Sequence, residues 1–105
     1  MFSGGEYEEV RRWLWNFVIS HAKRENLSVE CVVEDGRPRE GKSYGVRLQV
    51  GERLLPPATE PAMELTYPDV AQNRGSIAWC SALAARVRTL ARQLSDADRA
   101  SRKSA

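Results

Sequence analysis

The chain has 105 residues, of which 42% are hydrophobic and 29% charged, and this is the balance of an ordinary globular domain. A chain of this length buries one hydrophobic core, so we expect a single domain, and no apolar run is long enough to cross a bilayer. The net charge of +2 hides an asymmetry, because residues 1–73 carry nine basic and twelve acidic side chains, whereas residues 74–105 carry seven and two. The last third of the chain is therefore its electropositive part.

An amphipathic helix is predicted over residues 6–26. Its apolar side chains recur at intervals of three and four residues, at Tyr7, Val10, Leu14, Phe17, Val18 and His21. Trp13 and Trp15 lie two positions apart, so at about 100° per residue their rings leave the helix in nearly opposite directions. One face of the helix cannot bury both rings, and Trp15 forms a second apolar patch with Ile19, one turn further on.

Alternating apolar and polar residues predict two antiparallel strands over residues 28–34 and 44–50, joined by a turn-rich segment over 35–43. A short third strand over 53–55 ends at Pro56, because proline has no backbone N–H to donate. Residues 63–67 alternate again. They form either the third main strand or the continuation of an edge after a proline-containing excursion.

Residues 69–75 are predicted to be a loop, and Ser76 is the expected N-cap of a second helix that ends near Leu94. Ala78, Ala82 and Ala85 lie on one side of this helix, which reflects either helix propensity or a close contact with another backbone. Residues 96–105 offer no large apolar side chain to bury, so we expect a disordered tail after a single domain over 1–95. The order of elements predicts an α+β two-layer sandwich, with three or four antiparallel strands and two helices packed on one sheet face.

The extra apolar face of the first helix is the main functional signal. Burying a large aromatic side chain contributes about 2–3 kcal/mol, so something should cover Trp15. Either the segment 54–62 or the second helix covers it, or the face docks a partner. Our hypothesis is a module for protein–protein interaction or dimerisation that uses this face, through Trp13, Trp15 and Ile19, or an exposed sheet edge.

The alternative function is binding of RNA or DNA through the basic residues of the hairpin loop and the second helix, Arg37, Arg39, Lys42, Arg88 and Arg92. The order of elements resembles that of double-stranded RNA-binding domains. Those domains begin their second helix with lysines, whereas this helix begins with Ser76 and Ile77. Binding of this kind would weaken steeply with added salt.

The sequence has few residues of the types that form catalytic or metal sites, so we expect neither an enzyme nor a bound cofactor or metal. One histidine, His21, and two isolated cysteines, Cys31 and Cys80, match no known ligand spacing and no catalytic motif. We expect both cysteines to be reduced and buried. The first residues lack the features of a secretory signal, so a cytoplasmic location is expected.

The segment from Gly36 to Ser43 matches the spacing of a phosphate-binding loop, including Lys42. Such a loop needs a helix directly after it, and the residues that follow here are strand-like. We interpret the match as accidental.

Overall fold

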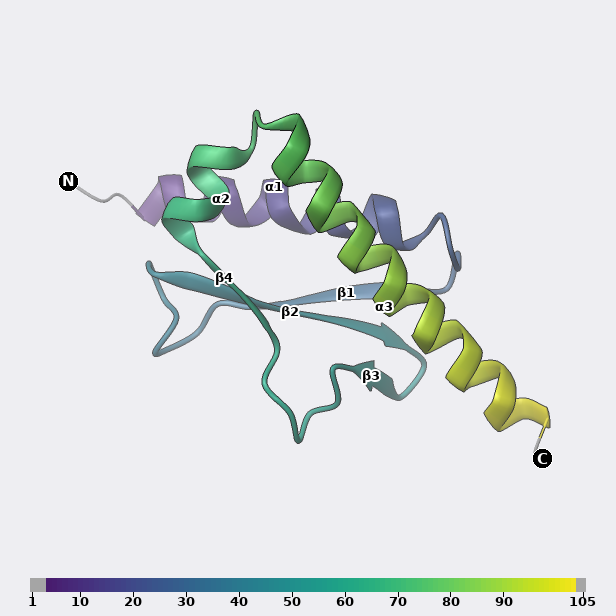
Figure 1. Ribbon diagram of the computed structural model, residues 1–105. Helices are drawn as coiled ribbons and strands as arrows, with labels where there is room; N and C mark the ends of the chain where they lie inside the picture. Colours follow the sequence, from purple (N-terminus) through teal and green to yellow (C-terminus); the bar gives the residue numbers. More distant parts are fainter. Residues whose placement is uncertain (1–3, 104–105) are drawn as a thin grey trace.

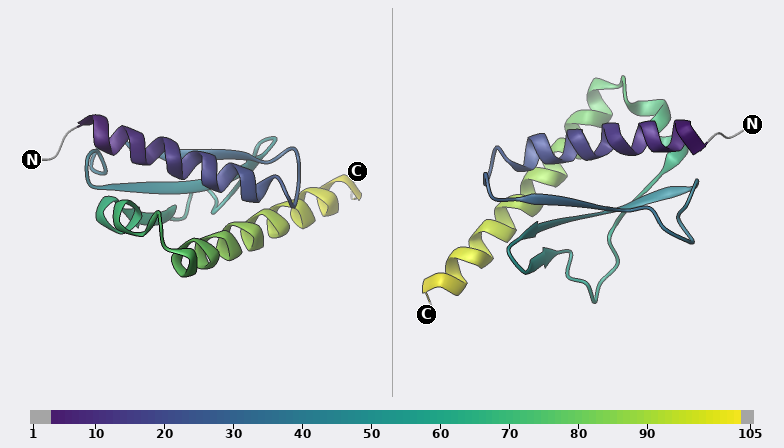
Figure 2. Two further views of the ribbon diagram at one scale, coloured as in Figure 1. Left: turned by 90° about the horizontal axis from the view of Figure 1, so that it is seen from above. Right: turned by 180° about the vertical axis from the view of Figure 1, so that it is seen from behind.

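The computed structural model describes residues 4–103, with side chains described over 6–100. This part of the chain folds into three helices and one four-stranded antiparallel sheet (Figure 1). The elements are α1 (Gly4–Ala22), β1 (Glu30–Glu34), β2 (Ser43–Val50), β3 (Arg53–Leu55), β4 (Met63–Thr66), α2 (Tyr67–Asn73) and α3 (Ile77–Lys103). Helix α1 lies along the sheet and α3 packs beside it (Figure 2), which confirms the predicted α+β class.

Strand β2 is the centre of the sheet. One edge of β2 pairs with the whole of β1, with Cys31 opposite Leu48. Its other edge is shared, because β4 pairs with residues 43–46 and β3 with residues 48–50. Of the two alternatives for residues 63–66, the second is therefore correct: β4 continues the edge of β3 after the excursion over 56–62.

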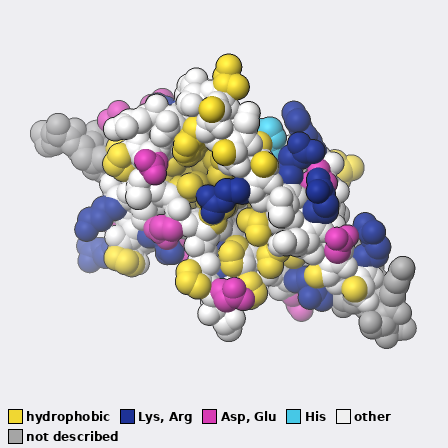
Figure 3. Space-filling model, in the orientation of Figure 1, with side chains coloured by type: hydrophobic (Ala, Val, Ile, Leu, Met, Phe, Trp, Pro, Cys, Tyr) yellow, Lys and Arg dark blue, Asp and Glu magenta, His cyan; other side chains and the backbone are white. Residues whose placement is uncertain are grey.

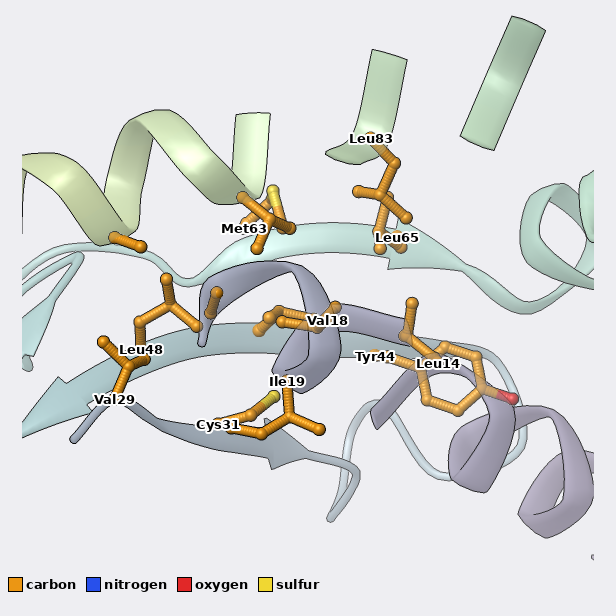
Figure 4. Close-up of a cluster of buried hydrophobic side chains, with 14 of the residues drawn as sticks. Leu14, Val18, Ile19, Val29, Cys31, Tyr44, Leu48, Met63, Leu65 and Leu83 are labelled. Carbon is orange, nitrogen blue, oxygen red and sulfur yellow. The ribbon is translucent and has the colours of Figure 1, made fainter. Parts of the chain in front are cut away.

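The core lies between the sheet and the helices. Alternate residues of β2 are buried against the helices, and Tyr44, Val46 and Leu48 are fully buried. Leu14 and Val18 of α1 meet these side chains, as the predicted apolar stripe requires (Figure 4). The remaining residues of the same core come mainly from α3, namely Leu83, Val87, Ala91 and Leu94.

Helix α2 stands where a loop was predicted, and Tyr67 begins it instead of ending a strand. Thr66 caps the helix by accepting a hydrogen bond from the backbone N–H of Asp69 at 3.3 Å. Pro68 lies in the first turn, where its missing N–H costs nothing. The prediction therefore overlooked a capped helix of seven residues, and residues 4–103 form three helices instead of two.

Helix α3 continues to Lys103, beyond the end predicted near Leu94. Residues 96–103, where a disordered tail was predicted, are helical in this structure, and residues 104–105 lie outside the described residues. An established helix adds one hydrogen bond for each residue it orders, so it extends without core contacts. The alanines here favour the helix, and Asp96 and Arg99 form a pair one turn apart.

The sheet face opposite the helices carries a buried arginine. Arg47 of β2 is 8% exposed, and its Nε lies 2.8 Å from the Glu34 carboxylate. Its Nη1 donates to the backbone carbonyls of Pro56 and Pro57, at 3.0 and 2.7 Å. These bonds attach the excursion over 56–62 to the centre of the sheet.

A second arginine extends this network. Arg39, from the loop before β2, pairs with Glu34 at 3.4 Å and with Glu64 of β4 at 3.0 Å. Its guanidinium lies over Gly45, where an added Cβ would stand 2.8 Å from Arg39 Cζ. A glycine is needed at this position for the arginine to reach both carboxylates.

Candidate protein-binding surface

The structure does not bring Trp13, Trp15 and Ile19 together on one surface. Ile19 is buried in the core and lies next to Cys31 (Figure 4). Trp13 is half-buried between α1 and α3, with its ring centroid 5.1 Å from that of Phe17 and 6.5 Å from that of Trp79. Of the three, Trp15 is the most exposed, at 37%.

Trp15 turns toward the edge of the sheet. Its indole N–H donates to the backbone carbonyl of Cys31 in β1 at 3.1 Å. Strand β1 is an edge strand, so this bond occupies a backbone group at the border of the sheet. Trp15, which the sequence analysis proposed as a partner-binding residue, therefore helps to protect this edge of the sheet.

The opposite edge is open at β4. The backbone N–H of Tyr67 bonds to the carbonyl of Lys42 at 2.8 Å, and the register pairs Leu65 with Tyr44 and Glu64 with Gly45. Bonded and non-bonded pairs alternate in an antiparallel ladder, so the N–H and C=O of Glu64 point away from β2. Within residues 4–103 no strand pairs with this side of β4, and Glu64 is exposed.

Residues of β4 and α3 line two pockets. The larger, which we call the Met63 pocket, has a volume of about 470 Å³ and is lined by Pro56, Pro61, Ala62, Met63, Ala85, Arg86, Thr89, Leu90 and Gln93. The smaller, the Leu65 pocket, has a volume of about 80 Å³ and is lined by Leu65, Trp79, Ala82, Leu83 and Arg86. We call the two pockets and the outer edge of β4 together the α3–β4 surface.

The lining of the two pockets is mainly apolar and contains one charged side chain. Hydrophobic side chains gather on this face of the molecule, with a basic side chain among them (Figure 3). Arg86 lines both pockets, and no acidic side chain of the described residues lines either. None of the ion pairs found within residues 6–100 involves Arg86. The surface therefore offers two apolar recesses and one cation to a ligand.

Sequence reasoning missed most of this surface. The row of Ala78, Ala82 and Ala85 was a signal, and two of these three residues line the pockets. Met63 and Leu65 were recognised only as alternating strand residues. Arg86 was one arginine among several, and nothing in its sequence context separates it from the others.

The five basic residues proposed for nucleic acid fall in two distant regions. Arg88 and Arg92 both bind Glu25, at 3.3 and 3.2 Å, and so join α3 to the end of α1. Their hydrogen bonds to Glu25 lower the pKa of its carboxyl group.

The hairpin loop holds the other three basic residues. Arg39 is used in the sheet network described above, and Arg37 lies 3.9 Å from Glu40. Lys42 is exposed. The segment from Gly36 to Ser43 runs directly into strand β2 and not into a helix, so it lacks the context of a phosphate-binding loop.

His21 and Cys80 share a third pocket, which the sequence did not predict. It has a volume of about 260 Å³ and lies between the end of α1 and the start of α3. Burial, followed by the charges of Arg24 and Arg88, lowers the pKa of His21, so its imidazole is neutral near pH 7. The Sγ of Cys80 lies 3.5 Å from the carbonyl of Arg74, to which the thiol donates. The thiol is thus bound to backbone and not to the imidazole.

Comparisons with protein-family models, with curated proteins and with solved structures find no match to this chain. Among the residues that the structure describes, no helix has the length and apolar character needed to cross a membrane. The same residues contain no group of three or more His, Cys, Asp or Glu side chains that could hold a metal ion.

Proposed function

We propose that the protein is a binding module that docks a segment of another protein on the α3–β4 surface. The observation that carries this proposal is the open edge of β4 beside two apolar pockets that, among the described residues, contain a single unpaired cation. An exposed strand edge is a common site for protein partners, because its free backbone groups accept a strand from any suitable chain. Apolar pockets next to such an edge add side-chain selectivity.

The same observations favour a protein over a nucleic acid. Binding to phosphates requires several cations that face the ligand together. In this structure Arg39, Arg88 and Arg92 are already bound to carboxylates. Within residues 6–100 the α3–β4 surface has a single arginine among apolar side chains, which suits side chains and backbone of a protein.

The experiment is selection from a phage library of random twelve-residue peptides on the immobilised protein. Ala85→Glu places a charged side chain in the Met63 pocket, and Ala78→Glu is the matched control on the same helix, outside both pockets. Both positions are exposed, so both variants should fold, as circular dichroism will show. We expect peptides that bind the wild type and the Ala78→Glu variant but not the Ala85→Glu variant.

Three outcomes would overturn the proposal. The first is that no peptide is enriched, or that binding is insensitive to Ala85→Glu. The second is a concentration-dependent dimer, seen by sedimentation equilibrium and abolished by Ala85→Glu, which would make a second copy the occupant. The third is salt-sensitive binding of double-stranded RNA or DNA without enrichment of any peptide, which would favour the basic surface.

A further inference from the structure

We infer that the occupant of the α3–β4 surface is an extended segment that adds to β4 as a new strand, with apolar side chains at alternate positions and a carboxylate that meets Arg86. This inference rests on the proposed function and names the chemistry of the partner. It is carried by three independent features, which are the direction of free backbone groups, the spacing of the pockets and the single charge.

The backbone of Glu64 supplies the hydrogen bonds. Its N–H and C=O point away from β2, as the bond from Tyr67 to Lys42 and the register of β4 require. A residue placed opposite Glu64 in an antiparallel strand would exchange two hydrogen bonds with it. That residue would point its side chain to the same sheet face as Glu64, away from the helices.

The neighbours of that residue would then face the pockets. Met63 and Leu65 are two residues apart, and each lines a different pocket. Side chains two residues apart on the added strand share a face, so they meet the two pockets in turn. The volumes of about 470 and 80 Å³ select a large side chain opposite Met63 and a small one opposite Leu65.

Arg86 selects the charge of the segment. Its side chain lines both pockets, and in the described residues no carboxylate lines either of them. A guanidinium forms strong, bidentate contacts with carboxylates, and Arg86 is exposed, so it can reach a carboxylate of a docked segment. An acidic residue on the groove side of the partner strand is therefore favoured over a basic one.

The probe is a synthetic peptide of nine residues, blocked at both ends. Its central run is valine, threonine, leucine, threonine and glutamate, so that valine, leucine and glutamate share one face. In a second peptide the same residues are reordered so that valine and leucine are adjacent. In a third, the threonine between valine and leucine is N-methylated, which removes the N–H that would bond to the carbonyl of Glu64.

Binding is measured by fluorescence anisotropy, and the backbone amide of Glu64 is followed by NMR hydrogen exchange. We expect the reordered and N-methylated peptides to bind at least about tenfold more weakly than the probe. The reordered peptide can place only one of its two apolar side chains in a pocket, and the N-methylated peptide lacks one backbone hydrogen bond. We also expect the Glu64 amide to exchange at least about tenfold more slowly when the probe is bound.

A charge reversal tests Arg86. The Arg86→Glu variant should bind the probe at least about tenfold more weakly, and a probe with lysine in place of glutamate should recover most of the loss. Arg53→Glu, on β3 and outside both pockets, is the control and should bind the original probe as the wild type does.

The inference and the proposed function fail in different ways. If library peptides bind in an Ala85→Glu-sensitive manner but the Glu64 amide stays unprotected, strand addition is overturned and the docking surface stands. Strand addition is likewise overturned if the probe does not bind although library peptides do, or if N-methylation or charge reversal has no effect. If no peptide binds at all, the proposed function itself is overturned.

Discussion

At the β1 edge of the sheet a tryptophan of α1 occupies a backbone carbonyl, whereas at the β4 edge the backbone of Glu64 faces away from β2 and pairs with no strand of residues 4–103. Open strand edges invite pairing with other chains, so proteins usually cover them or keep them short. Here Trp15 occupies one backbone group of the first edge, the carbonyl of Cys31. The second is left open but is divided by the excursion into β3 and β4, of three and four residues.

The comparison shows that the open edge offers few backbone groups to a partner, but that the pocket beside it is held in a fixed shape. Arg47 holds the excursion through the carbonyls of Pro56 and Pro57, and so fixes the end of the Met63 pocket. A short edge with few free backbone groups binds weakly by itself. Its selectivity must come from the pockets beside it.

The largest effect is expected from Arg47→Met, which removes the attachment of the excursion. The change removes the buried guanidinium, leaves the carbonyls of Pro56 and Pro57 without their donor and leaves Glu34 with Arg39 alone, so we expect a loss of about 3 kcal/mol in the free energy of unfolding. Urea denaturation monitored by tryptophan fluorescence measures it. The exposed Arg53→Met is the control, and a loss below about 1 kcal/mol for Arg47→Met would contradict the role assigned here.

Burial in the core should protect Cys31 of the β1 edge from modification. Burial raises the pKa of its thiol to about 12, and only the thiolate reacts rapidly. Cys80 is half-exposed. At pH 8 we expect iodoacetamide to modify Cys31 at least about 100-fold more slowly than Cys80, as followed by peptide mass spectrometry. Equal rates would show that the β1 edge opens readily.

The same shift has a consequence for stability. The pKa of Cys31 rises from 9.0 to about 12 on folding, so the folded state keeps a proton that the unfolded chain releases. Its contribution to stability is complete below pH 9 and is lost as the pH rises toward 12. A Cys31→Ala variant should therefore lose less stability over this range than the wild type does.

Trp15→Phe removes the indole N–H and uncovers the carbonyl of Cys31. We expect a loss of about 1 kcal/mol in the free energy of unfolding, since one partly buried hydrogen bond disappears. We also expect weak self-association in sedimentation velocity, because the β1 edge then resembles the open one. An unchanged stability together with a strictly monomeric variant would mean that Trp15 does not protect the edge.

The smallest effect is expected from Gly45→Ala, on the sheet face opposite the helices. The new methyl group would displace the guanidinium of Arg39 from Glu34 and Glu64, at a cost of about 0.5 kcal/mol. In an Arg39→Ala background the same change should be neutral or slightly stabilising, because alanine suits a strand better than glycine. Additive effects in this double-mutant cycle would contradict the coupling.

Local patterns in the sequence determined the secondary structure of this protein to a large extent. The apolar stripe of α1 and the alternation in β1 and β2 predict those elements, because each pattern reports which side of the element is buried. The short α2 was missed, because its cap at Thr66 and its Pro68 resemble the signals of a turn. The end of α3 was missed as well, because no core contact marks it.

The tertiary structure alone decided the candidate site. Trp15 and Ile19 are adjacent on the helix, yet one reaches the β1 edge and the other is buried in the core. Arg86 and Arg88 are two residues apart, yet Arg86 lines both pockets, whereas Arg88 binds Glu25, which is distant in the chain. Such contacts join segments that are distant in sequence, so they depend on how the elements pack and on the register of the strands, which no local pattern contains.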